Sequence, residues 1–130
     1  MFMSDRSRIL VVEDEPLIAE LLRDWLSDLG CEVVGPVASN GAGLALLAEG
    51  PLSGAILDIS VLDGQTYDIA EALQQQGVPF LFATGHNSEG IDPQFRGVPV
   101  LQKPFVFDAL AAAVSELGGM GNQAAQLTPS

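Results

Sequence analysis

The chain has 130 residues, of which 48% are hydrophobic and 17% charged, which fits one globular domain and excludes a disordered chain. Seventeen acidic residues outnumber five basic ones, so we expect no direct binding to nucleic acid or to a membrane surface. No apolar run is long enough to span a bilayer, and we expect no signal peptide. Cys31 is the only cysteine, which excludes an intramolecular disulfide and favours a cytoplasmic location.

Continuous apolar runs, typical of strands covered on both faces, alternate with stretches whose apolar residues recur every three or four positions, as in amphipathic helices. Proline in a first turn, polar caps and closing glycines set the expected helix ends. The expected elements, in chain order, are a strand over 9–12, a helix from Pro16 to its stop at Gly30, a strand over 32–35, a helix capped by Asn40 and ended by Gly50-Pro51, a strand over 55–57 ending at Asp58, a helix capped by Thr66 and closed by Gly77, strands over 78–83 and 98–101, and a helix over 105–117.

Regular alternation of strands and helices predicts an α/β fold. We expect a doubly wound, five-stranded parallel sheet of flavodoxin-like order 2-1-3-4-5, with helices on both faces. One domain is expected over residues 8–117, between flexible segments at 1–7 and 118–130. The segment 87–97 takes the place of one helix but contains Gly90 and Pro93, so a short, distorted or mobile helix is expected there.

Polar residues follow four of the five predicted strands. Glu13 and Asp14 come after the first, Asp58 after the third, Thr84 after the fourth and Lys103, the only lysine, after the fifth. Because the carboxyl ends of parallel strands lie along one edge of a sheet, we expect these side chains to meet there.

Three adjacent carboxylates repel each other, at about 4 kcal/mol for each pair about 4 Å apart at an effective dielectric constant of about 20. The single charge of Lys103 does not offset three, and oxygen ligands with open positions suit Mg²⁺. A magnesium ion, a lysine and a hydroxyl together suit phosphoryl transfer. Asp58 is the candidate nucleophile, and Thr84 and Lys103 are the candidate ligands of the phosphoryl oxygens.

Four motifs, "ILVVEDEP", "AILDIS", "FATG" and "LQKPF", occur in order with strand and helix spacing between them. With them the chain resembles the receiver domain of bacterial two-component response regulators of the stand-alone type. The resemblance implies that the carboxylates of Glu13, Asp14 and Asp58 and the backbone carbonyl of Ser60 bind Mg²⁺. It further implies that Asp58 accepts phosphate from a histidine, that Thr84 and Lys103 contact the phosphoryl group, and that the Lys103-Pro104 bond is cis.

The chain departs from the usual receiver pattern in three places. The loop "DISVLDGQTYDIA" lacks the proline that most receivers carry, and together with Phe-Ala-Thr-Gly it resembles a subset linked to general stress signalling. His86 and Asn87 stand where that subset usually has an apolar residue and a tyrosine, and we interpret His86 as tuning water access. Val100 occupies the place of the usual aromatic switch residue, so Thr84 is predicted to report phosphorylation through residues 85–96.

The favoured function is a phosphorylation switch that catalyses only its own phosphorylation and dephosphorylation. The alternative is a degenerate receiver that binds partners independently of phosphorylation. A phosphatase of the haloacid dehalogenase type is disfavoured because Ser60 stands where its second aspartate belongs. A flavodoxin-like cofactor binder is disfavoured because Glu13-Asp14-Glu15 would repel a phosphate.

The resemblance also implies the partners. A sensor histidine kinase, a histidine phosphotransferase or both are expected as phosphate donors, and a downstream protein is expected to receive the signal. No DNA-binding domain is expected with the receiver, so regulation or phosphate relay would run through protein contacts, with homodimer formation left open.

Overall fold

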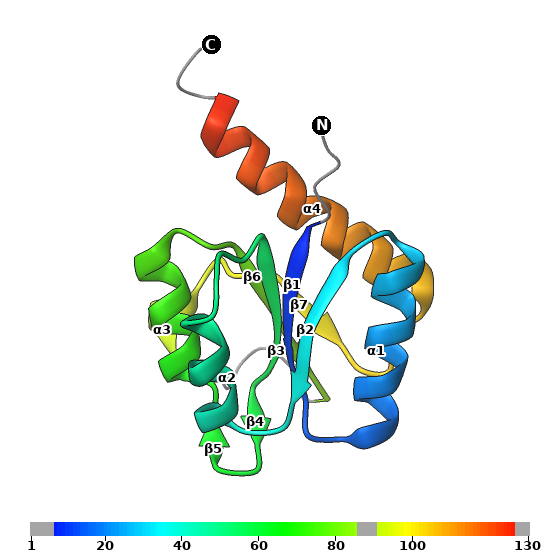
Figure 1. The fold of residues 1–130 in the computed structure, drawn as a ribbon, viewed down its shortest axis with the longest axis vertical. Coiled ribbons are helices and arrows are strands. Elements are labelled where there is room, and N and C mark those ends of the chain that lie inside the picture. Colours follow the sequence, from blue (N-terminus) through cyan, green and yellow to red (C-terminus); the bar gives the residue numbers. More distant parts are fainter. Residues whose placement is uncertain (1–6, 86–90, 127–130) are drawn as a thin grey trace.

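The computed structural model describes residues 7–85 and 91–126. Its main sheet has five strands in the order β2-β1-β3-β6-β7, and every neighbouring pair runs parallel (Figure 1). The strands are β1 (Arg8–Val12), β2 (Glu32–Val37), β3 (Gly54–Asp58), β6 (Phe80–Thr84) and β7 (Val100–Gln102). The predicted doubly wound sheet and its strand order are confirmed.

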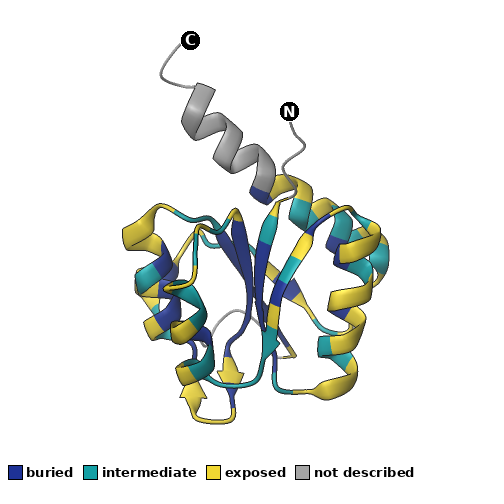
Figure 2. Ribbon diagram, in the orientation of Figure 1, coloured by how far each residue is buried: buried dark blue, intermediate teal, exposed yellow. Residues whose placement is uncertain are grey.

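Two pairs of helices cover the two faces of the sheet (Figure 1). The four helices are α1 (Pro16–Asp28), α2 (Asn40–Leu47), α3 (Tyr67–Gln76) and α4 (Phe107–Gln126). Leu22 and Leu26 of α1 and Leu110 and Leu117 of α4 pack in one buried cluster, while α3 and α2 pack on the other face. The strands between these clusters form the buried centre of the molecule, as Figure 2 shows.

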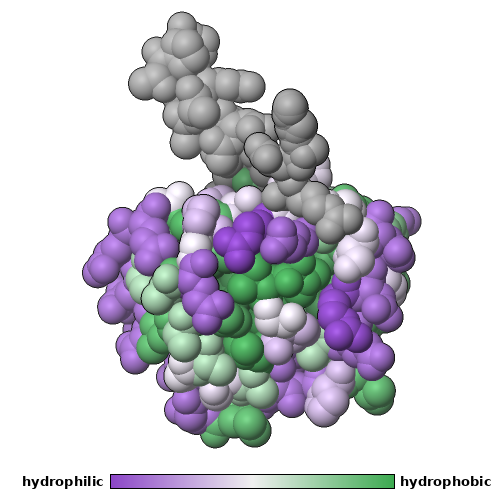
Figure 3. Space-filling model, in the orientation of Figure 1, coloured by the Kyte–Doolittle hydropathy of each residue, from purple (hydrophilic) through white to green (hydrophobic). Residues whose placement is uncertain are grey.

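The helices on the face drawn in Figure 3 differ in hydropathy. On the face drawn in Figure 3, hydrophilic residues lie over the outer sides of α1 and α3, and hydrophobic residues gather between them. Within the described part of the chain, no helix has the length and apolar character required to cross a membrane.

Several helix ends differ from the sequence prediction. α2 ends at Leu47, before the predicted stop at Gly50-Pro51, and α4 begins at Phe107 and not at Phe105. Ser39, and not Asn40, caps α2, because its side chain accepts a hydrogen bond from the Ala42 N–H at 3.2 Å. Thr66 does precede α3, but its side chain makes no cap hydrogen bond. Gly77 closes α3 as predicted, in a left-handed conformation with φ of 73° that favours glycine.

Prolines displace the starts of two strands. β6 begins at Phe80 and β7 at Val100, each two residues later than predicted and directly after a proline. Proline has no N–H to donate to a strand ladder, which accounts for both starts.

The last helix is longer than the sequence predicted. The expected helix ended at Leu117, whereas the backbone of α4 continues to Gln126. Glycine lowers helix propensity by about 1 kcal/mol relative to alanine, which weakens a helix without ending it. The flexibility expected for 118–130 stays a prediction.

The expected weak helix is confirmed for the part of its segment that is described. Residues 91–97 contain one short 3-10 turn, η2 (Pro93–Phe95), capped by the Asp92 side chain. Residues 86–90, including His86 and Asn87, lie outside the described residues.

A short hairpin follows β3 where the sequence indicated only a loop. Its strands β4 (Ser60–Val61) and β5 (Gly64–Gln65) pair antiparallel. Asp63 at the hairpin turn accepts hydrogen bonds from the backbone N–H groups of Asn40 at 2.7 Å and Gly41 at 3.2 Å, so the hairpin is fastened to the start of α2.

Candidate functional site

The polar residues singled out from the sequence lie together at the carboxyl edge of the sheet, and we call this edge with its polar residues the rim. Glu13 follows β1, Asp58 and Thr84 are the last residues of β3 and β6, and Lys103 follows β7. The backbone N–H of Lys103 donates to the Thr84 carbonyl at 2.8 Å, which fastens these two strand ends to each other. The Lys103-Pro104 bond is cis, as the resemblance implied.

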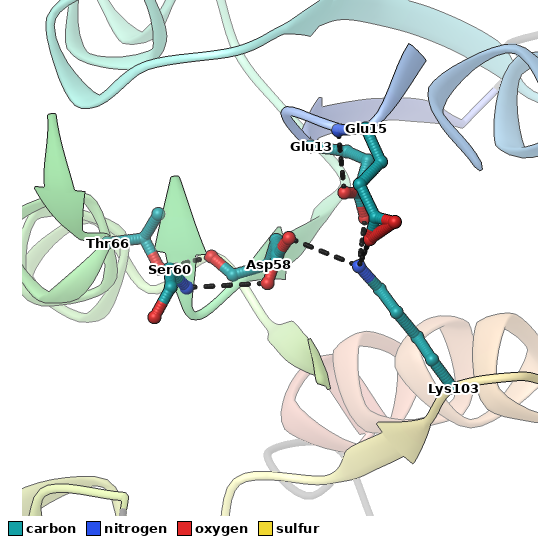
Figure 4. A network of polar contacts seen from close by, with 6 residues as sticks. All are labelled: Glu13, Glu15, Asp58, Ser60, Thr66 and Lys103. Atoms are coloured by element: carbon teal, nitrogen blue, oxygen red, sulfur yellow. Dashed lines mark hydrogen bonds and ion pairs between the residues drawn. The ribbon is translucent and has the colours of Figure 1, made fainter. Parts of the chain in front are cut away.

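Lys103 reaches three carboxylates at this edge. Its Nζ lies 2.8 Å from Glu13 Oε1, 3.1 Å from Asp58 Oδ2 and 3.3 Å from Glu15 Oε1 (Figure 4). The side chains of Lys103 and Asp58 are 10% and 11% exposed, so this ion pair is shielded from bulk water. The ammonium group therefore acts on Asp58 through a strong, poorly screened interaction.

Asp14 completes an acidic group with two of these residues. One carboxylate oxygen from each of Glu13, Asp14 and Asp58 lies within 4.8 Å of the other two. The pKa of Glu13 is raised from 4.5 to about 7, chiefly by burial; the Lys103 ammonium opposes this rise and the neighbouring Asp58 adds to it. One ammonium thus leaves the acidic group short of positive charge.

The same balance acts on Lys103. Burial lowers its pKa, but the neighbouring Glu13 and Asp58 outweigh burial and raise the pKa above its ordinary value of 10.5. Lys103 is therefore an ammonium group at any physiological pH.

An open pocket of about 210 Å³ gives access to Asp58. Its walls are formed by Asp14, Glu15, Asp58, Ser60, Thr84, Gly85 and Lys103. The Ser60 backbone N–H donates to Asp58 Oδ1 at 3.3 Å, so each oxygen of the Asp58 carboxylate has its own contact, one with Ser60 and one with Lys103. A small anionic group entering this pocket would meet the ammonium group and the Asp58 oxygens together.

Two residues of the site were not foreseen from the sequence. Glu15 contacts Lys103, and its backbone N–H donates to Glu13 Oε2 at 3.1 Å. Thr66 donates from its hydroxyl to the Asp58 carbonyl at 2.8 Å. Glu15 had a signal in the acidic triplet of residues 13–15, whereas nothing in the sequence distinguished Thr66 from an ordinary helix cap.

Comparison with known protein families identifies the family of this chain. The profile of the response regulator receiver domain family matches residues 9–115. The chain belongs to this family. The resemblance given by its four motifs is thereby confirmed.

Two solved structures and one curated protein show where the receiver lies among its relatives. The solution structure of SdrG from Sphingomonas melonis Fr1 is 44% identical, with a TM-score of 0.78 over 88% of this chain and 98% of that one. A BeF3-activated conformation of SdrG from Pseudomonas melonis Fr1 is 44% identical, with a TM-score of 0.75 over 89% of this chain and 99% of that one.

The curated relative is the phyllosphere-induced regulator PhyR of Methylorubrum extorquens. It is 30% identical over 118 residues, which cover 85% of this chain. The matched region is 43% of PhyR, so the receiver chain corresponds to less than half of that protein.

Proposed function

We propose that this receiver accepts a phosphoryl group on Asp58, in a Mg²⁺-dependent transfer from the phosphohistidine of a sensor kinase or a phosphotransferase. Phosphorylation then changes its contacts with a downstream protein. The observation that carries the proposal is the position of Asp58, whose Oδ2 lies 3.1 Å from Lys103 Nζ while its carboxylate also belongs to the acidic group with Glu13 and Asp14.

The acidic group fits a divalent cation. Glu13 Oε1 is buried and has no aligned hydrogen bond from the described residues, although Lys103 Nζ lies 2.8 Å from it as an ion pair. Carboxylate and carbonyl oxygens are the ligands that Mg²⁺ prefers, so Glu13, Asp14, Asp58 and the Ser60 carbonyl would hold the ion. When bound, the ion would neutralise charge on the phosphoryl oxygens.

Each residue of the rim has a separate role in the phosphoryl transfer. An Asp58 oxygen attacks phosphorus, and as the new P–O bond forms the P–N bond to the donor histidine breaks. The electron pair of that bond goes to the imidazole nitrogen, which takes a proton from solvent. Lys103 turns from its carboxylate partners to a phosphoryl oxygen, and the Thr84 hydroxyl binds a second one.

Two further observations support this assignment. BeF3 is a chemical mimic of a phosphoryl group, and a relative that is 44% identical has a BeF3-activated conformation. The net charge of −12 favours protein partners over nucleic acid. The proposal thus includes a receiver domain over 8–117 that works in the cytoplasm through protein contacts.

Intact-mass measurement after incubation with acetyl phosphate and Mg²⁺ tests the assignment. We expect one added phosphoryl group, which is lost with EDTA and in Asp58→Asn but retained in Asp68→Asn, a matched change of an exposed carboxylate on α3. Labelling that persists in Asp58→Asn would place the acceptor elsewhere. An unlabelled wild-type chain would favour the degenerate, binding-only receiver.

A further inference from the structure

The hydroxyl of Thr66 contacts the main chain of the proposed phosphoacceptor. Thr66 is fully buried, with 0% exposure, and its Oγ1 donates to the Asp58 carbonyl at 2.8 Å. Its backbone N–H donates to the carbonyl of the next residue, Ile59, at 2.9 Å. A single residue at the start of α3 therefore holds two consecutive carbonyls of the turn that leaves β3.

This use of the hydroxyl replaces the role expected for threonine at that position. Thr66 precedes the first residue of α3, where a threonine side chain commonly accepts a hydrogen bond from the helix backbone. Here the side chain makes no such cap bond. The hydroxyl is directed instead toward the end of β3, which points to the turn and not to the helix as the structure that it supports.

Asp58 lies between Lys103 on one side and Ser60 and Thr66 on the other, as Figure 4 shows. Its carboxylate is bound by Lys103 Nζ at 3.1 Å and by the Ser60 N–H at 3.3 Å. Its main-chain carbonyl accepts the hydrogen bond from Thr66, on the same side as Ser60. The turn from Asp58 to Ser60 also carries the carbonyl that is the proposed main-chain ligand of Mg²⁺.

We propose that Thr66 is a positioning residue whose hydroxyl fixes the turn Asp58–Ser60, so that the Asp58 carboxylate and the Ser60 carbonyl face one cation together. This inference rests on the proposed function. Mg²⁺ requires nearly ideal octahedral geometry at short distances, so a small displacement of the turn weakens binding. Loss of a residue that orients metal ligands typically lowers affinity by about 10- to 100-fold.

Three variants separate the effect of the Thr66 hydroxyl on Mg²⁺ binding from the effects of side-chain shape and of stability. Thr66→Val keeps the shape and removes the donor, and Thr66→Ser keeps the donor and removes only the methyl group. Ile69→Val is a matched deletion from a fully buried residue of α3, the helix that follows Thr66. Mg²⁺ dissociation constants are measured from backbone amide chemical shifts, and each fold is checked by thermal unfolding in EDTA.

We expect the dissociation constant of Thr66→Val to rise by about tenfold or more, with Thr66→Ser and Ile69→Val close to wild type. Equal affinity in Thr66→Val and wild type would overturn the inference while leaving the proposed function intact. An equal loss of Mg²⁺ affinity in Ile69→Val would also overturn the inference, because the loss would then result from lower stability of the fold and not from the missing hydroxyl. If Thr66→Val does not fold, Thr66→Ala takes its place under the same criteria. A wild-type chain that binds no Mg²⁺ would instead contradict the proposed function.

Discussion

Lys103 Nζ and Asp58 Oδ2 lie 3.1 Å apart although 45 positions separate the two residues in the sequence. Two further carboxylates, from Glu13 and Glu15, contact the same ammonium group. The ammonium group thus attracts the carboxylates of the rim toward one another. The same positive charge would attract an incoming phosphoryl group and repel a cation bound next to it.

The first prediction separates these two effects of Lys103. In Lys103→Gln we expect Mg²⁺ to bind several-fold more tightly because a repelling charge is gone. Labelling of Asp58 by acetyl phosphate at saturating Mg²⁺ should nevertheless slow by about tenfold or more, since a donor to the developing charge is lost. The control is Arg23→Gln, which removes an exposed positive charge from α1. Unchanged labelling in Lys103→Gln would contradict its proposed role.

The second prediction concerns the effect of Mg²⁺ on stability. A ligand that binds only the folded state stabilises it by about 2.7 kcal/mol at a hundred times its dissociation constant. Addition of Mg²⁺ at that level should therefore raise the melting temperature measured by calorimetry, and EDTA should reverse the rise. In Asp14→Asn, which loses one carboxylate of the acidic group, the same Mg²⁺ concentration should produce a much smaller rise. An equal rise in both proteins would exclude Asp14 as a ligand.

The third prediction tests how the segment after β6 is anchored. Phe95 is 1% exposed, and its ring stacks on Tyr67 at 5.2 Å between centroids and packs edge-on against Phe82 at 5.7 Å. Because Phe82 lies two residues before Thr84 on β6, this cluster links the rim to η2.

Phe95→Ala should lower the free energy of unfolding by about 3–5 kcal/mol. It should also speed hydrogen exchange selectively at the Arg96 and Val98 amides, which donate to carbonyls within the turn. Leu22→Ala, in the buried cluster on the other face of the sheet, provides the comparison. Equal acceleration of those amides in both variants would show that Phe95 has no local role. Hydrogen exchange measured with and without BeF3 would then show whether phosphorylation changes the protection of this segment, as predicted for a signal from Thr84.

The fourth prediction is a pH dependence at the hairpin. The hydrogen bond from the Asn40 backbone N–H is the main cause that lowers the pKa of Asp63 below its ordinary value of 3.8. A carboxyl group with a lowered folded-state pKa stabilises the protein above its unfolded-state pKa, and this contribution is lost as pH falls through the lower value. Asp63→Asn should therefore melt at a lower temperature than wild type at pH 6, and the difference should shrink as pH falls below 3.8.

Asp24→Asn, a change of an exposed carboxylate on α1, is the control for this pH series. A difference between Asp63→Asn and wild type that is the same at every pH would show that the carboxylate charge plays no part in fastening the hairpin to α2.

The main sheet and the position of its rim residues followed from local patterns. Apolar runs that end in Glu13, Asp58 or Thr84 predict strands, and parallel strands bring their carboxyl ends to one edge. The meeting of these residues was therefore predictable from the strands and their parallel direction, and the structure places Lys103 at the same edge.

Side-chain hydrogen bonds between distant segments were not predictable in this way. Ser39 and Asn40 are both good cap residues, and Ser39 is the cap because the Asn40 side chain donates to Asp63 and Gln65, over twenty residues away. The hydroxyl of Thr66 is likewise used outside its own helix. Local propensity does not register such partners, since they come into reach only after the chain has folded.

A crystal structure of the receiver with Mn²⁺, which replaces Mg²⁺ as an anomalous scatterer, and with BeF3 would show directly where the cation and the phosphoryl mimic bind. We expect one anomalous peak bound by the acidic group and the Ser60 carbonyl, beryllium bonded to an Asp58 oxygen, and Lys103 Nζ turned from Glu15 to a fluorine atom. A peak without Asp58 among its ligands, or beryllium bonded to any other residue, would contradict Asp58 as the phosphoacceptor and metal ligand.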